Sequence, residues 1–476
     1  MECTRFQLLD RHLRYMIRRI IFWFVVSLFV FLVALSIWMR VDSTAKLEAV
    51  VNRLVAAGAP MTIEELLPEP VADELNAADL YLELDALLES YCVCDAMDQR
   101  LTEISGIERY SNDIYLFKIS QTEWGIVDEL MQDERVQNQL ALIHEVAKRP
   151  YFQPDWQYEA GPAMLIPEVG VARSAAELLL IQAAQAVRSD DFEKVNRNLQ
   201  GVIALSKQAE QCPNLISYLT SIAIRGLASS FLEAATLELG SAGDFKPDLW
   251  DHSVHGAWDY PMDGERLCMG VIIYEAFLKG DKDAFEKING SPAPKKFAAL
   301  RLSPVASYFR YDYVFYLEYM EAARGMNQEF YDDYAKLSQK LEEQMFPPDR
   351  RKYMHVLSSI LIPALGKVRE VAFRSDAQNI INRTALQIAK YKREHGEYPD
   401  RLDTLVPEYL ERMPVDLFNG EPLIYRNDGD RFTLYSVGPN FTDDRGVTNE
   451  NSQANEDEGD IIWAGFGSSL SRAEVE

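Results

Sequence analysis

The segment ELLLIQAAQAVRSDDFEKVNRNLQGVIAL, residues 177–205, decides the fold class of this chain. Its first part is rich in leucine and alanine, which both favour helix, and we expect that helix to occupy residues 172–188. Ser189 then breaks the pattern, and Asp190 and Glu193 stand at capping-box spacing for the start of a second helix. The apolar residues of the second helix share one face: Phe192, Val195, Leu199, Val202 and Leu205. This stretch predicts two antiparallel helices joined by a tight turn.

The same helical pattern continues over most of the chain. Cys212-Pro213 interrupts the second helix, and a third helix begins near Leu215. The helical stretches are separated by loops rich in proline and glycine, near residues 150–169, 241–262 and 289–304. No fixed repeat period is visible. The sequence therefore predicts that residues 40–375 form an α-helical region, which is either a bundle or an irregular solenoid.

The segment IIFWFVVSLFVFLVALSIWM, residues 20–39, contains no charged residue. Twenty residues of helix span roughly 30 Å, which is the thickness of the hydrocarbon core of a bilayer. Five arginines precede this segment, against two acidic residues. Because cytoplasmic flanks tend to be basic, we expect residues 1–19 in the cytoplasm, a transmembrane helix at 20–39, and the remaining chain outside. A cleaved signal peptide is the alternative, although its apolar region usually has only about 7–15 residues.

The formal net charge of the chain is −26, and the part that follows the apolar segment is more acidic still, since the first residues are basic. A surface of this charge repels phosphate backbones, so the composition argues against a nucleic-acid partner. It suits a solvated extracytoplasmic region, or one that meets cations.

Four cysteines lie beyond the apolar segment: Cys92, Cys94, Cys212 and Cys268. Outside the cytoplasm an even set of cysteines can form disulfides, and four cysteines allow three connectivities. The alternative is that they remain free thiols, packed as small hydrophobic groups.

Seven tyrosines crowd residues 303–337: Tyr308, Tyr311, Tyr313, Tyr316, Tyr319, Tyr331 and Tyr334. Tyrosine often fills partly buried helix faces while its hydroxyl finds a polar partner. We expect that role here, with a ligand groove as the alternative.

The last part of the chain changes character. An apolar helical stripe runs from about Ala377 to His395, and Gly396 suits the left-handed cap of a helix end. Two short extended segments, 423–426 and 431–435, then flank an Asp-Gly turn, which is a hairpin signal. A third strand is expected at residues 460–463. The sequence predicts a small α+β unit with an antiparallel sheet at residues 376–463, and a flexible tail at residues 464–476.

Residues 376–463 resemble the C-terminal globular domain of the major pseudopilin of type II secretion, the secretion protein G domain. The resemblance is carried by Gly396-x-Tyr398-Pro399, Pro414-x-Asp416-x-Phe418-x-Gly420-x-Pro422, Phe432-x-Leu434-Tyr435-Ser436-x-Gly438-Pro439-Asn440 and Asp460-Ile461-Ile462-Trp463. The preceding ELNAADLYLELDALL, residues 74–88, is similar to segments of uncharacterised bacterial single-pass membrane proteins that append such a unit to a helical ectodomain. The resemblance implies a place in the inner membrane, a protein partner in the envelope and a link to secretion.

The resemblance also implies calcium, which many members of that family bind in the loop before the last strand. By position, the ligands here are the Ser436 carbonyl and the side chains of Asn440, Asp443, Asp444, Glu458 and Asp460. Calcium takes six to eight oxygens from such groups in flexible loops. The alternative is a solvated acidic loop without metal, since surface loops are often rich in Asp and Asn.

The N-terminus departs from the pseudopilin pattern. Pseudopilins have a glycine cleavage site and a following Phe-Thr-Leu-x-Glu, and residues 18–23, RRIIFW, contain neither the glycine nor the glutamate. Assembly into a pseudopilus is therefore a separate hypothesis, which requires a processed N-terminus.

Catalytic signatures are absent from the sequence, which has no G-x-S-x-G, H-E-x-x-H or G-x-x-x-x-G-K-[ST] motif. His252 and His255, with Asp251 and Asp259 nearby, have spacing that suits a metal site on one helical face. The prediction is a non-enzymatic envelope protein, and the alternative is an envelope enzyme with a metal site near these two histidines.

Overall fold

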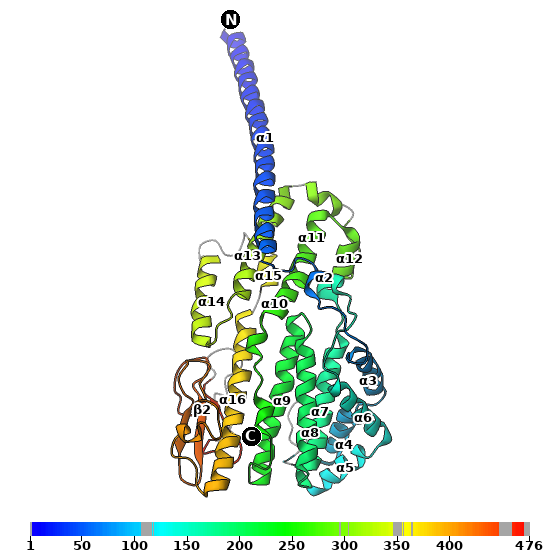
Figure 1. Cartoon of the computed structure of the whole chain (residues 1–476). Coiled ribbons are helices and arrows are strands. Elements are labelled where there is room, and N and C mark those ends of the chain that lie inside the picture. The colour runs from blue at the N-terminus through cyan, green and yellow to red at the C-terminus, as the bar shows by residue number, and fades with distance from the viewer. Residues whose placement is uncertain are drawn as a thin grey trace.

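The chain begins with one long helix, α1 (Glu2–Ala56), which projects from one end of the remaining structure (Figure 1). The computed structural model describes residues 2–105, 117, 119–294, 297–302, 304–345, 355, 357–362, 365–446 and 459–470. No residue in the most apolar window of α1 is buried, and the predicted segment 20–39 lies within this helix. By its length and composition, the helix could cross a membrane. A signal sequence near an N-terminus meets the same criteria.

The lower end of α1 joins the folded body. Val50 and Leu54 are buried, and this part of α1 packs against α13 (Pro304–Arg324). The Tyr311 hydroxyl of α13 donates a hydrogen bond of 2.6 Å to Asp42 Oδ2 of α1. The exposed apolar part of α1 is therefore the continuation of a helix whose other end belongs to the core.

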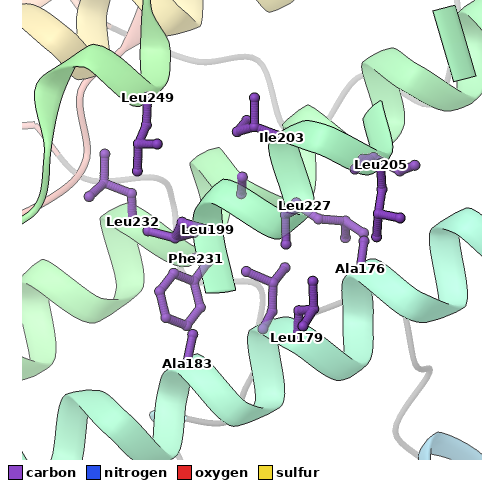
Figure 2. Close-up of a cluster of buried hydrophobic side chains, with 14 of the residues drawn as sticks. Ala176, Leu179, Ala183, Leu199, Ile203, Leu205, Leu227, Phe231, Leu232 and Leu249 are labelled. Carbon is purple, nitrogen blue, oxygen red and sulfur yellow. The ribbon is translucent and has the colours of Figure 1, made fainter. Parts of the chain in front are cut away.

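Three helices form the centre of the body: α7 (Pro167–Arg188), α8 (Phe192–Glu210) and α9 (Leu215–Leu239). The two predicted helices and the third are confirmed, and α7 begins earlier than predicted, with Pro167 in its first turn, where a proline fits. Figure 2 shows the apolar side chains that the three helices share, among them Leu179, Leu199 and Phe231. A Cβ on Gly201 would lie 2.7 Å from Leu179 Cδ1, so glycine permits this close approach of α7 and α8.

The predicted capping box of α8 does not form. Asp190 adopts a left-handed conformation, with φ of 57°, and closes the turn after α7. Asp191 is therefore the N-cap, and its side chain accepts a hydrogen bond of 3.0 Å from the Lys194 amide. The residue that turns the chain cannot also cap the helix, and the cap moves one position along.

The helical region is a bundle and not a solenoid. The helix α7 packs on α9 as well as on α8, and a helix distant in sequence, α16 (Leu365–His395), packs along α9. On the opposite side of α7 and α8 lie four more helices, α3 (Ala78–Ser90), α4 (Val93–Ser105), α5 (Gln121–Met131) and α6 (Glu134–Lys148) (Figure 1). The other helices are α2 (Ile63–Leu66), α10 (Asp259–Glu265), α11 (Ile272–Lys279), α12 (Lys282–Asn289), α14 (Tyr331–Met345) and α15 (Ser358–Leu361).

The helix before the sheet is longer than the sequence indicated. It begins at Leu365 and not at Ala377, so the predicted boundary between residues 375 and 376 falls inside α16. Its predicted end is confirmed, because Gly396 follows with φ of +86° and its amide donates to the Lys392 carbonyl.

The predicted antiparallel sheet is present. Its three strands are β1 (Ile424–Asn427), β2 (Phe432–Ser436) and β3 (Ile461–Ile462), in the order β1-β2-β3. The sheet lies against α16, on the side away from α9 (Figure 1). Residues 464–470, which the sequence assigned to a flexible tail, continue from β3 and bond to β2, with the Ser469 amide donating to the Phe432 carbonyl at 2.7 Å. The remaining tail residues, 471–476, lie outside the described residues.

Most of the tyrosines in residues 303–337 fill buried helix faces, as predicted. Tyr313, Tyr316, Tyr319 and Tyr334 are all buried, and the Tyr313 ring stacks on Tyr274 with centroids 4.6 Å apart.

Cys92, Cys94, Cys212 and Cys268 are free thiols, so the disulfide alternative is not formed in this structure. Three of them are buried, as the packing alternative expected. Cys92 is half-buried, and a hydrogen bond with Cys94 lowers the pKa of its thiol to about 7.

Candidate functional site

The two histidines singled out by the sequence do not share a metal site. His252 Nε2 lies 2.9 Å from Glu210 Oε2 of α8, while His255 Nδ1 lies 2.6 Å from Asp376 Oδ2 of α16. Their expected co-ligands are also engaged, since Asp251 pairs with Arg383 and Asp259 with Arg324. The premise of one helical face fails because His252 lies outside any helix and His255 opens a short 3₁₀ turn, His255–Ala257. Within the described part of the chain, no group of three or more His, Cys, Asp or Glu side chains could hold a metal ion.

Residues 253–255 surround the buried carboxylate of Asp376 with hydrogen-bond donors. Asp376 accepts hydrogen bonds from the Ser253 hydroxyl (2.7 Å), the Val254 amide (2.9 Å), the His255 amide (2.9 Å) and His255 Nδ1 (2.6 Å). We call this group the Asp376 clasp. Burial alone would raise the pKa of this carboxyl, but the hydrogen bonds from His255 and Val254 outweigh it and lower the pKa. The carboxylate, which is only 3% exposed, therefore stays ionised inside the protein.

The clasp contains a serine, a histidine and an aspartate, but it is not a catalytic triad. In a triad the serine and the aspartate bond to opposite ring nitrogens of the histidine. Here Ser253 Oγ lies 3.0 Å from the same Nδ1 that bonds to Asp376, and Oγ itself donates to Asp376. A carboxylate only accepts hydrogen bonds, so the Ser253 hydroxyl proton and the His255 Nδ1 proton both point at Asp376. His255 Nδ1 therefore cannot accept the proton of Ser253 as a general base would. The arrangement binds a loop to a helix.

Arg369 holds the other end of the same loop. Its guanidinium is fully buried, donates to the His255 carbonyl and to Asn327 Oδ1 (3.2 Å), and lies 5.0 Å from the centre of the Trp258 ring. Arg369 and Asp376 are seven positions apart on α16, which places both on one face of the helix. The loop before α10 is thus fixed to α16 at two points.

The described residues that follow α16, 396–446 and 459–470, contain the three strands and are called the sheet unit. The sheet unit is attached to α9 as well as to α16. The Ala464 amide donates to Glu233 Oε1 at 3.4 Å, and the Phe466 amide donates to Thr236 Oγ1 at 3.2 Å. Glu233 and Thr236 both lie on α9. The unit therefore contacts the central bundle both directly and through the helix that carries it.

Five of the six predicted calcium ligands lie in the described part of the loop, and Glu458 lies outside it. Asp460 is 3% exposed and accepts hydrogen bonds from the Asp444 amide (3.3 Å) and the Gly446 amide (2.6 Å). Asp443 Oδ1 accepts from the Tyr435 hydroxyl at 2.8 Å, and Asp444 Oδ2 accepts from Nδ2 of the Asn440 side chain at 2.8 Å. These residues lie near one end of the sheet, but the described carboxylates Asp443, Asp444 and Asp460 do not form a group that could hold a metal ion.

Ser436 serves a different carboxylate with its side chain. Its hydroxyl donates to Asp416 Oδ1 at 2.8 Å, and the amides of Val437 and Phe418 also donate to Asp416. Asp416 is buried, and it ties the loop before the sheet to the end of β2. This leaves the Ser436 carbonyl, and not the hydroxyl, as the group to consider for a cation.

The electrostatics of the loop favour a positive charge. Burial raises the pKa of Asp460 to about 6, and the nearby carboxylates of Asp444 and Asp443 add to this effect. The donor types, carboxylate and carbonyl oxygens, are those that calcium binds.

The residues that the sequence did not reveal are Asp376 and Arg369. The partners of Asp376 lie 121 to 123 positions away, so no local spacing could connect them. Both residues occur in α16, and the sequence assigned the first part of this helix, up to residue 375, to the preceding α-helical region. A charged residue on the apolar face of that helix was the one available signal.

Comparison with family models, with curated proteins and with solved structures finds no match for this chain. The resemblance to the pseudopilin domain therefore stays a prediction from the quoted motifs.

The Asp376 clasp predicts a large effect of a small substitution. Asp376→Asn keeps the shape but removes the charge and places an amide donor against other donors. We expect it to lower the free energy of unfolding by about 2–4 kcal/mol, measured by chemical denaturation. Asp248→Asn, at an exposed position nearby, is the matched control and should change little.

The pH dependence has a defined sign. Because the pKa of folded Asp376 lies below the ordinary value of 3.8, its stabilisation is present above pH 3.8 and disappears as the pH falls below that value. This acid-sensitive part should be missing in Asp376→Asn. Equal stability of the two proteins at pH 7 would contradict the assigned role.

Proposed function

We propose that this chain is a non-enzymatic, single-pass membrane protein that presents a pseudopilin-like unit to a protein partner in the bacterial envelope. The observation that carries the proposal is α1, whose apolar part is exposed while its last turns are packed into the body. Exposing a continuous apolar helix of this length to water is unfavourable, and a bilayer removes that penalty.

The orientation follows from charge. Arginines cluster before the apolar segment, and the chain after it is strongly acidic. From this difference in charge across the apolar segment, we expect residues 1–19 in the cytoplasm and the body on the outer side of the inner membrane. In this orientation the sheet unit lies on the side of the body away from the bilayer, because α16 runs toward the pole opposite α1 (Figure 1).

The resemblance of residues 376–463 to the pseudopilin domain supports a role in protein interaction, with secretion as the associated process. The unit packs against α16, and two partly buried hydrogen bonds join it to α9, which suits a rigid docking module. A pilus subunit is a separate possibility, and mass spectrometry of the N-terminus distinguishes it, since a pilus subunit requires a processed N-terminus and our proposal requires an unprocessed chain that retains residues 1–19.

Protease protection tests the membrane topology. In spheroplasts, added protease should digest the body, whereas inverted vesicles should protect it. Replacing Arg14, Arg18 and Arg19 together by glutamate should invert or scatter the orientation, while replacing all three by lysine should preserve it. Recovery of the wild-type body in the soluble fraction, with residues 1–39 removed, would overturn the anchored protein in favour of a cleaved signal sequence.

We also propose that the loop around Asp460 binds calcium. Asn440, Asp443, Asp444, Asp460, the Ser436 carbonyl and Glu458 would hold the ion. A divalent cation would relieve the repulsion that contributes to the raised pKa of Asp460. The ion would clamp the loop onto the end of the sheet.

Thermal melts of the full chain test the calcium site. Millimolar calcium should raise the melting temperature of the wild type and of Asp400→Asn, an exposed control in the same unit, but not that of Asp460→Asn. With chelator, lowering the pH from 7 to 5 should stabilise the wild type relative to Asp460→Asn. The reason is that the folded pKa of about 6 lies above the unfolded value of 3.8, so the folded state binds the proton more tightly.

A melting temperature that is the same in calcium and in chelator would assign the loop to solvated surface. The anchored interaction protein would then stand without a metal.

A further inference from the structure

A pocket of about 480 Å³ lies where the sheet unit meets the helical bundle. Its walls come from the start of α8, the loop 240–247 after α9, the last turns of α16, and two residues of the sheet unit, Tyr398 and Phe466. Both α9 and α16 end at the pole of the body opposite α1 (Figure 1). The residues that line the pocket therefore lie toward the pole opposite α1, and the volume of the pocket is within the range of roughly 300–1,000 Å³ for sites that bind small molecules.

The floor of the pocket is apolar. It is formed mainly by Phe192, Leu239, Phe245, Pro247, Leu386 and Phe466. The rings of Phe192 and Phe245 meet edge to face, with centroids 5.5 Å apart. Gly243 lines the pocket with φ of +54°, and a Cβ there would lie 2.5 Å from the Phe192 ring, so a side chain at this position would disturb the aromatic wall. The shape of the floor depends on this glycine.

The rim of the pocket is cationic, in a chain whose net charge is −26. Four basic residues line it, Lys246, Lys390, Lys392 and Arg393, against two acidic ones, Asp190 and Asp244. Arg393 Nη1 pairs with Asp244 Oδ1 at 2.9 Å, and the Lys392 ammonium lies 3.9 Å from the centre of the Tyr398 ring. Among the described residues, Lys246 and Lys390 form no ion pair with a carboxylate, and the Lys390 ammonium lies 5.5 Å from the centre of the Tyr409 ring. An anion would therefore not have to displace a carboxylate from either ammonium group.

We infer that this pocket binds a small amphiphilic carboxylate, with the apolar part on the aromatic floor and the carboxylate at Lys246 and Lys390. Burial of the apolar part supplies affinity, and the two ammonium groups supply selection for a negative head group. A cationic amphiphile would meet repulsion at the rim, and a neutral one would gain only the apolar contacts. The part of the chain after residue 39 is acidic overall and repels anions, so within the body binding of this class should be specific to the pocket.

Isothermal titration of the full chain in nanodiscs, with empty nanodiscs subtracted, tests the inference. The probes are 4-phenylbutyrate, 4-phenylbutanol and 4-phenylbutylamine, which share one apolar group and differ in head charge. We expect one-to-one binding of the acid, about tenfold tighter than that of the alcohol, and no saturable binding of the amine.

Two double variants locate the site. Lys246→Gln with Lys390→Gln should weaken binding of the acid about tenfold and leave binding of the alcohol unchanged. Lys207→Gln with Lys340→Gln removes the same charge at exposed positions outside the pocket and should leave both unchanged. Both pairs are surface changes, and thermal melts verify that each variant folds. Equal affinities for the three head groups, no binding of the acid, or equal loss in both double variants would overturn the inference.

A carboxylate on an apolar group can come from a free small acid or from the end of a peptide chain. Acetyl-Leu-Phe with a free carboxylate, compared with its amide, distinguishes these sources in the same titration. Tighter binding of this peptide than of 4-phenylbutyrate, lost in the amide, assigns a chain end, and weaker binding assigns a free acid.

Discussion

The buried carboxylate of Asp376 is the interaction on which the arrangement of the body depends. An ionised group in the interior is destabilising by several kcal/mol unless hydrogen bonds replace its water. Asp376 is 3% exposed and receives four such bonds, all from Ser253, Val254 and His255. Helix α16 and the loop before α10 can satisfy this group only in one register. Arg369, two turns earlier on the same face, adds a second point of attachment through the His255 carbonyl.

This constraint determines where the sheet unit stands. The helix α16 has 31 residues, so it extends roughly 45 Å, and its first half is fixed by Arg369 and Asp376. Its second half carries the unit and packs along α9, and residues 464 and 466 bond to α9 directly. The pocket with the cationic rim exists because these parts meet, since its lining comes from α8, α9, α16 and the sheet unit together. A unit free to move would have no such pocket.

Local patterns predicted the local structure well. The helices α7 to α9, the hairpin of β1 and β2, the third strand and the Gly396 cap all follow from periodicity and turn chemistry in short windows. Sequence alone could not decide between bundle and solenoid, because that depends on α16 packing on α9 from far along the chain.

The errors have a common cause. His252 and His255 looked like a pair of metal ligands by spacing, yet their partners, Glu210 and Asp376, lie on two different helices. The start of α16 was placed too late because its first turns carry charged residues such as Arg369, which is buried through contacts distant in sequence. Calcium ligands in one loop could be proposed from a motif, whereas the clasp and the pocket required the packing of several elements.

Because α16 continues unbroken from Leu365 to His395, we expect residues 376–463 to unfold together with the bundle and not as a separate domain that starts at residue 376. Native-state hydrogen exchange of the full chain, followed over increasing denaturant, tests this most directly. We expect the amides in both halves of α16, in β2 and in α9 to converge on one unfolding free energy. Contrary evidence would be a separate, less stable opening of residues 376–463 that begins near residue 376 and leaves the first half of α16 and α9 protected.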